Sequence, residues 1–124
     1  MGVVKVQIEI LSLWGKETES LEVLVDTGAT LSVLPEKLLE RLGVERIGKV
    51  KVRVGDGRRI MREVGIVQLR VQGQLAAARV IFGKPKDPTV LGLTVLEQLG
   101  LTIDPVERRL VPTELFLLSR LTLF

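Results

Sequence analysis

Apolar and polar residues alternate in short runs along most of this chain, and glycine-containing turns separate the runs. A period of two places every second side chain on one face of an extended segment, so each run predicts a half-buried β-strand. The first two runs are Val4 to Ile10 and Ser20 to Val25. Many short strands in 124 residues are expected to form one mainly β, barrel-like domain around a modest core.

Turn residues join neighbouring runs into hairpins. Gly55-Asp56-Gly57 is the clearest case, because an Asp-Gly pair provides the positive φ that a tight hairpin turn needs. An ordinary surface hairpin is the alternative to a functional one here. The expected hairpins are Lys49–Val54 with Arg58–Ile66, Val64–Val71 with Leu75–Phe82, and Leu101–Ile103 with Leu110–Val111.

Two short helices are expected between the strands. In the first, Pro35 suits the first helical position and Gly43 suits the C-terminal cap. Before the second, Thr89 to Gly92 predicts a short buried strand. Thr94 and Glu97 then match a capping box, and the helix should run to Leu99 before Gly100. The apolar face of the first helix, expected in the core, consists of Leu38, Leu39 and Leu42.

One acidic residue has an unusual setting. Asp26 follows an apolar run and is itself followed by Thr27 and Gly28. The apolar neighbours on both sides predict that this loop lies in the protein interior, where a carboxylate is costly to ionise without hydrogen bonds or a partner. We therefore take Asp26 as a candidate functional residue. The alternative is an ordinary turn, because Asp, Thr and Gly all favour turns.

The composition limits the available chemistry. Cysteine and histidine are absent, which excludes disulfide scaffolds, metal sites built on Cys or His, thiol proteases and catalytic triads with a histidine base. Carboxylates, hydroxyls and lysines remain. The net charge of +3 is mild and aromatic residues are 3% of the chain, whereas nucleic-acid binders usually show a basic stripe with stacking rings. We expect no nucleic-acid partner.

The chain has no apolar run long enough to cross a bilayer and no signal-peptide pattern at its start. We therefore expect a cytoplasmic protein without a membrane partner. The tail from Leu115 to Phe124 is unusually apolar for a chain end, and its pattern does not separate strand from helix. We expect the tail to lie in a subunit interface, with simple coverage of the core as the alternative.

Two segments resemble the retropepsin-like aspartic proteases, the single-lobe relatives of pepsin. They are Leu24–Ala29, which contains Asp-Thr-Gly, and Val90–Gly100, which is similar to the family's apolar-apolar-Gly motif and its following helix. Gly55-Asp56-Gly57 falls between them, where the family has its flap. The resemblance runs from about Val4 to Val111. It implies a closed retropepsin-like barrel assembled as a two-fold homodimer, with a protease domain at 1–111 and an apolar tail at 112–124.

The resemblance also implies an activity, that of an aspartic endopeptidase acting on extended polypeptides without metal or cofactor. Such enzymes use two facing carboxylates that share one proton. This chain has a single Asp-Thr-Gly, so the dyad would join Asp26 to Asp26 of a second copy. A non-catalytic retropepsin-like module that dimerises or holds peptide is the alternative.

Family roles follow position by position. Thr27 would hydrogen-bond across the dyad, and Gly28 would let the substrate backbone approach. Ala29 stands where pepsin-like lobes have a hydroxyl, so the ionised dyad loses a hydrogen bond and the activity optimum should be less acidic than pepsin's. The resemblance places further substrate contacts at Ala29, Thr30, Gly55, Asp56, Gly57 and Val90.

The chain also departs from the retroviral pattern. Retroviral members usually have an acid at the position of Thr30 and an arginine at that of Leu93, and these two form an ion pair near the dimer contact. Both are missing here. The flap tip carries Asp56 with Arg58 and Arg59 instead of a run of glycines.

Overall fold

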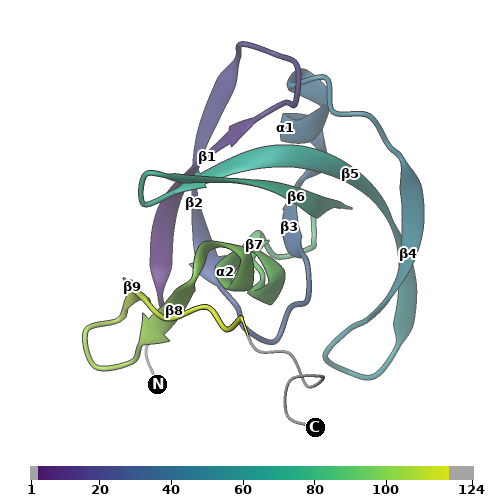
Figure 1. Cartoon of the computed structure of the whole chain (residues 1–124). Helices are drawn as coiled ribbons and strands as arrows, with labels where there is room; N and C mark the ends of the chain where they lie inside the picture. Colours follow the sequence, from purple (N-terminus) through teal and green to yellow (C-terminus); the bar gives the residue numbers. More distant parts are fainter. Residues whose placement is uncertain (1–2, 118–124) are drawn as a thin grey trace, which may run out of the picture.

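The computed structural model describes residues 3–117, which form nine β-strands and two short α-helices (Figure 1). The strands are β1 (Lys5–Leu11), β2 (Thr18–Val25), β3 (Ser32–Pro35), β4 (Gly48–Arg53), β5 (Arg59–Val71), β6 (Gln74–Gly83), β7 (Val90–Leu91), β8 (Leu101–Asp104) and β9 (Arg109–Pro112). The helices are α1 (Glu36–Arg41) and α2 (Leu93–Leu99). This confirms the predicted mainly β class with two short helices.

Seven strands form one sheet, in the order β1-β2-β7-β3-β6-β5-β4. β1 pairs with β2 along one side and with β5 along the other, so Ile10 lies between Glu19 and Leu69. Because β1 joins both ends of the series from β2 to β5, the sheet closes on itself. The closed barrel predicted from the resemblance is therefore confirmed. β8 and β9 form a separate two-stranded sheet.

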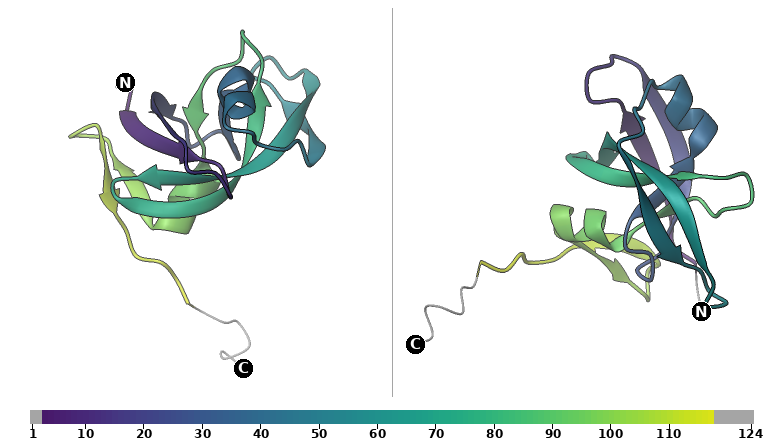
Figure 2. Two further views of the ribbon diagram at one scale, coloured as in Figure 1. Left: turned by 90° about the horizontal axis from the view of Figure 1, so that it is seen from above. Right: turned by 90° about the vertical axis from the view of Figure 1, so that its right-hand side faces the viewer.

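The longest strand, β5, belongs to both the barrel and a projecting arm. Its first half pairs with β4, up to Val64 opposite Gly48, and its second half pairs with β6. The sequence pattern predicts two overlapping extended segments here, and the structure joins them into one 13-residue strand. β4 and the first half of β5 thus form a hairpin arm that extends from the barrel (Figures 1 and 2).

The barrel interior is filled by the apolar positions of the alternating runs. Both helices add leucines to it, because the apolar face of each is turned to the sheet. Leu38, Leu39 and Leu42 are buried, as predicted. The largest fully buried side chains are Phe82, Ile8, Ile10, Leu34, Leu39, Leu69, Leu91, Leu96, Val23, Val64, Val67 and Val71.

The helix ends differ from the predictions at two positions. Pro35, predicted as the first helical residue, is the last residue of β3 and the N-cap of α1, so the helix begins one position later, at Glu36. The capping box predicted for Thr94 and Glu97 is wrong, since α2 begins at Leu93 and has no side-chain cap. The Thr94 hydroxyl instead donates to the carbonyl oxygen of Thr30, at 2.9 Å.

The described part of the tail follows β9, in the separate two-stranded sheet. The backbone amide of Thr113 donates to the carbonyl oxygen of Gly100, and Leu115, Phe116 and Leu117 are exposed. These three side chains therefore do not cover the core of this chain. The rest of the predicted interface tail, residues 118–124, lies outside the described residues. Within residues 3–117, no helix is long and apolar enough to cross a membrane.

Candidate active site

Asp26 is placed by the end of a strand in the middle of the sheet. β2 ends at Val25, where it runs parallel to β7 and pairs with Leu91. The amide of Asp26 continues this ladder by donating to the carbonyl oxygen of Leu91, at 3.0 Å. Asp26 is therefore fixed by the barrel, although it begins the loop that follows.

The loop after Asp26 turns its backbone toward the carboxylate. The amide of Gly28 donates to Asp26 Oδ1 at 2.9 Å, and the amide of Ala29 donates to the Asp26 carbonyl oxygen at 3.1 Å. A carboxylate that accepts a backbone amide is held in one orientation. Ala at position 28 would add a Cβ at 3.2 Å from Asp26 Oδ1.

The prediction that this loop lies in the interior is wrong for the single chain. Asp26, Thr27 and Gly28 are exposed. The flanking strands bury Val23 and Leu34, but the loop extends past the end of the sheet. The carboxylate can therefore meet solvent, substrate or another copy of the chain.

Residues at the start of α2 hold the Asp26 loop in place by hydrogen bonds. The amide of Leu93 donates to the Ala29 carbonyl oxygen at 2.8 Å, and the amide of Thr94 donates to that of Thr30 at 3.2 Å. The buried hydroxyl of Ser32 accepts the amide of Gly92 at 2.9 Å. The Asp-Thr-Gly segment and the Val90–Gly100 segment, which are distant in sequence, are thus joined by hydrogen bonds.

A cavity of about 910 Å³ opens beside Asp26. Figures 1 and 2 show the loop after β2 and the tip of the β4–β5 hairpin at the same end of the molecule. Of the predicted site residues, the cavity is lined by Asp26, Gly28, Ala29, Thr30, Gly55 and Val90. Thr27, Asp56 and Gly57 are not among its lining residues.

The sequence pattern did not mark most of the cavity wall. The residues it missed are Leu31, Val33, Val50, Lys51, Val52, Arg53, Val54, Ile60, Arg62, Ile81, Asp87 and Pro88. One signal was available for Val50 and Val52, since the alternation in β4 places both on the same face as the hairpin partner Ile60. Nothing in the local pattern marked Arg62 or Asp87.

The tip of the β4–β5 hairpin is held by hydrogen bonds between its own residues. Gly57 has φ of +89° and donates its amide to the Val54 carbonyl oxygen at 2.9 Å. Asp56 accepts the backbone amide of Arg58 at 3.0 Å and Arg58 Nε at 2.7 Å. These bonds, the backbone one first, hold the pKa of Asp56 below its usual range.

An ion pair lies in the cavity wall. Arg62 on β5 donates from Nε and Nη2 to the two carboxylate oxygens of Asp87, at 2.6 and 2.8 Å. The side-chain bonds from Arg62 lower the pKa of Asp87, against the opposing effect of burial. Within the described part of the chain, no three acidic, histidine or cysteine side chains gather as a metal-binding group.

A closed barrel with an Asp-Thr-Gly loop at its rim and a hairpin arm beside the cavity is the architecture of a single-lobe aspartic protease. The comparisons with known proteins agree. Residues 16–98 match a family model described as "gag-polyprotein putative aspartyl protease". The chain belongs to this family, and the resemblance to retropepsin-like proteases noted in the sequence is confirmed.

Solved structures of retroviral proteases are similar to most of this chain. EIAV protease complexed with the inhibitor HBY-793 superposes with a TM-score of 0.61 at 25% identity, covering 83% of this chain and 93% of that one. The solution structure of Simian Foamy Virus (mac) protease gives a TM-score of 0.54 at 25% identity, covering 77% and 93%. No curated protein matches the sequence.

Proposed function

We propose that this chain is an aspartic endopeptidase that cleaves extended polypeptides as a homodimer, with Asp26 of each copy forming the catalytic dyad. The observation that carries the proposal is the setting of Asp26. Its carboxylate is oriented by the Gly28 amide at the edge of a cavity of about 910 Å³. Membership of the aspartyl protease family supports the same assignment.

The charges around the cavity support a second copy as the source of the other acid. Asp26 and Asp87 are the carboxylates among the described lining residues, and Asp87 is bound by both nitrogens of Arg62. Asp87 is therefore neutralised, and Asp26 has no acidic partner in this wall. A two-fold axis beside the exposed loop would bring Asp26 against its own copy.

The proposed mechanism needs no metal. Two carboxylates a few ångströms apart cannot both ionise cheaply, so the pair holds one proton. The ionised Asp26 takes a proton from a bound water as the water oxygen attacks the peptide carbonyl carbon, and the protonated Asp26 gives its proton to the carbonyl oxygen. The tetrahedral intermediate then collapses. One of its hydroxyls gives a proton to the ionised Asp26, the protonated Asp26 gives its proton to the nitrogen, and the C–N bond breaks, which releases an amine and leaves the dyad with one proton.

The wall of the cavity supports an extended substrate with apolar side chains. Aliphatic residues from five strands line it, namely Val33, Val50, Val52, Ile60, Ile81 and Val90. A peptide would lie between this wall and the hairpin arm, with its backbone paired as an added strand. Closure of the hairpin tip at Gly55 would then exclude water from the reacting bond.

We also propose that residues 1–111 form the protease domain and that the apolar tail at 112–124 contributes to the dimer interface. Support comes from Leu115, Phe116 and Leu117, which are apolar and exposed in the described part of the tail. A chain ending at Pro112 should then dimerise more weakly than the full chain, as measured by sedimentation. Unchanged dimerisation would assign the tail another role.

The activity is tested by digestion of a random peptide library over a range of pH, with and without a statine-type transition-state analogue. We expect cleavage that the analogue inhibits and that Asp26→Asn abolishes while dimerisation remains. Cleavage that survives Asp26→Asn would refute the dyad. Absence of inhibitable cleavage at every pH would favour a non-catalytic peptide-binding or dimerisation module.

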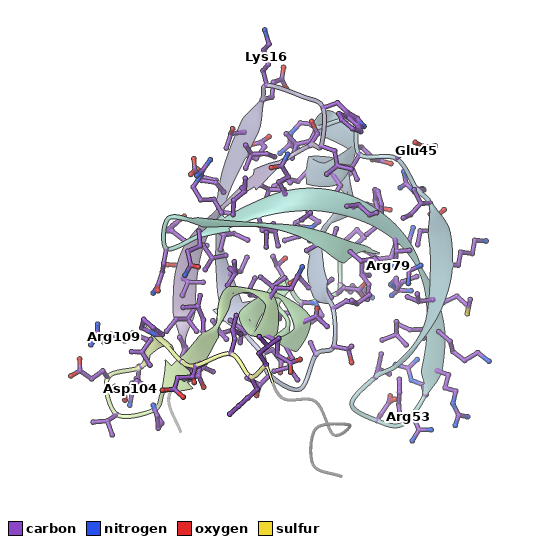
Figure 3. All side chains as sticks on the ribbon, viewed as in Figure 1. Lys16, Glu45, Arg53, Arg79, Asp104 and Arg109 are labelled. Atoms are coloured by element: carbon purple, nitrogen blue, oxygen red, sulfur yellow. The ribbon has the colours of Figure 1, made fainter. Side chains whose placement is uncertain are left out.

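A mixing experiment tests whether the dyad is shared between copies. Because each mixed dimer would hold one Asn, an excess of Asp26→Asn chains should suppress the activity of wild-type chains. Asp104→Asn is the matched control, since Asp104 lies in the β8–β9 hairpin, on the opposite side of Figure 3 from Arg53 and the arm. Equal inhibition by both variants, or by neither, would contradict a shared dyad.

A further inference from the structure

Arg62 and Asp87 connect two parts of the cavity wall that the strand ladder leaves separate. Arg62 lies on the arm half of β5, and Asp87 lies in the loop between β6 and β7. Both residues line the cavity. Their two hydrogen bonds, at 2.6 and 2.8 Å, have the forked geometry in which a guanidinium binds a carboxylate most strongly.

The Asp87 carboxylate also organises its own loop. Oδ2 accepts the backbone amide of Lys84 at 2.8 Å, and the Asp87 amide donates to the Lys84 carbonyl oxygen at 2.9 Å. The same side chain therefore closes the turn and binds the arm. Pro88 and Val90, which follow it, line the cavity, so a movement of this turn would move that wall.

This pair is more shielded from solvent than the others. The side chains of Arg62 and Asp87 are 18% and 19% exposed. Every other ion pair between described residues has at least one partner that is 31% exposed or more. Exposed pairs contribute little, because water and salt screen them, whereas a shielded and forked pair resists separation.

The arm needs such a contact. β4 is the last strand of the sheet order and pairs with β5 alone. Arg62 stands two positions before Val64, where β5 begins to pair with β6. The ion pair therefore lies at the base of the arm, where a small change of angle is amplified at the tip.

We propose that Arg62 and Asp87 form a positioning latch, which holds the hairpin arm and the 84–88 loop at a fixed separation and so sets the width of the substrate groove. This inference rests on the proposed protease function, because the groove is the site assigned to the peptide. Neither residue is a catalytic residue. They act by keeping Val50, Val52 and Pro88 at the spacing that an extended peptide fits.

The latch is tested with Arg62→Met and Asp87→Asn. The second change keeps an oxygen for the Lys84 amide while removing the charge that Arg62 binds. For a peptide cleaved by the wild type, we expect KM to rise about tenfold, equivalent to about 1.4 kcal/mol, with kcat almost unchanged. The double variant should be little worse than either single variant, because both break one interaction. Arg62→Lys should lie between Arg62→Met and the wild type.

Arg70→Met is the matched control. Arg70 lies on the same strand, and its pair with Glu9 is exposed on both sides, at 42% and 46%. KM should not change in this variant. A KM unchanged in Arg62→Met, or raised equally in Arg70→Met, would overturn the latch.

Hydrogen exchange gives a readout that does not depend on activity. In Arg62→Met and Asp87→Asn, amides of residues 50–60 and 84–88 should exchange faster together, and by a larger factor than those of the barrel strand β1. This result in a protein without cleavage would support the latch and reject the protease proposal. Cleavage with unchanged exchange would reject the latch alone. Exchange accelerated by the same factor in the arm, the 84–88 loop and the barrel would also reject it, because the pair would then serve general stability alone.

Discussion

The amide of Gly92 donates a hydrogen bond of 2.9 Å to the hydroxyl of Ser32, and both residues are buried. Ser32 begins β3, just after the Asp26 loop, and Gly92 separates β7 from α2. Since a buried amide without a partner is costly, this bond fixes the α2 segment against the segment that follows Asp26. The shape of the Asp26 loop therefore depends on a serine outside it.

Ser32→Ala should destabilise the fold by about 1–3 kcal/mol, because the buried amide of Gly92 loses its acceptor. Urea denaturation measures the change. Ser12→Ala is the matched control, since the Ser12 hydroxyl accepts the Gly15 amide at an exposed position and its loss should cost at most about 0.5 kcal/mol. Equal losses in the two variants would show that the Ser32 bond has no special importance.

Gly92→Ala should destabilise the fold by about 1–3 kcal/mol or more, because there is no space for a side chain. A Cβ would lie 2.6 Å from the carbonyl carbon of Leu31 and 2.9 Å from the carbonyl oxygen of Ala29. Both are backbone atoms of the Asp26 loop region, so activity should fall too. Gly55→Ala has open space and should leave the denaturation midpoint nearly unchanged. A Gly92→Ala variant as stable as Gly55→Ala would contradict this packing.

The Arg62–Asp87 pair should make stability depend on acid. The pKa of Asp87 is lowered in the folded state, whereas in the unfolded chain it is about 3.9. The pair's contribution is therefore fully present above about pH 4 and is lost as the pH falls further, through the folded-state pKa. Asp87→Asn should thus be less stable than wild type at neutral pH, and the difference should shrink below about pH 4.

Urea denaturation at neutral pH, near pH 4 and in stronger acid measures this convergence. Glu9→Gln breaks an exposed pair and should show only a small difference from wild type at every pH. A difference for Asp87→Asn that stays constant across this range would indicate that Asp87 stabilises the fold through its shape and not its charge.

The proposed dimer has no ion pair at Leu93 that salt could weaken. This side chain is 38% exposed at the start of α2, and with Thr30 it replaces the charged pair expected for the family. High salt should therefore leave dimerisation unchanged or strengthen it, since no surface ion pair is screened. Leu93→Glu should weaken dimerisation, as followed by sedimentation, whereas Leu75→Glu, at another exposed site, should not. Dissociation by salt would reveal an ionic interface elsewhere.

Ala29→Ser should move the acid side of the pH–activity profile to lower pH. Ala29 follows the Gly28 amide that binds Asp26, and a hydroxyl there could donate a further bond to the ionised dyad. Initial rates against pH measure the shift. Ala77→Ser on the exposed side of β6 controls for the added hydroxyl. A profile unchanged by Ala29→Ser would exclude this position as a determinant of the optimum.

The sequence was informative where structure is local. Period-two alternation identified β1 and β2 because the side chains of a strand alternate between core and solvent whatever their partner. The apolar face of α1 and the left-handed glycine at 43, with φ of +73°, also depend only on near neighbours. The Asp-Thr-Gly triplet indicated the aspartic protease family only together with the Val90–Gly100 segment.

The failed predictions concern contacts between distant residues. The Thr94 hydroxyl bonds to Thr30, 64 positions away, so a local capping pattern could not describe it. Arg62 and Asp87 are 25 positions apart, and each alone resembles an ordinary surface charge. The apolar neighbours of Asp26 predicted burial of the loop, but a loop can leave the core at the residue where its strand ends.

The two-sided pairing of β1 has a consequence for the order of folding. Ile10 pairs with Glu19, which is close in the chain, and also with Leu69, which is 59 positions away. A chain emerging from the ribosome can form the β1–β2 hairpin early. It cannot close the barrel until β5 has been synthesised and can pair with β1. The long loop that must then close slows folding, and until closure β1 presents an unpaired edge that can bind a neighbouring chain. The strand that completes the barrel, β1, is therefore also a strand that can pair with the wrong chain during synthesis.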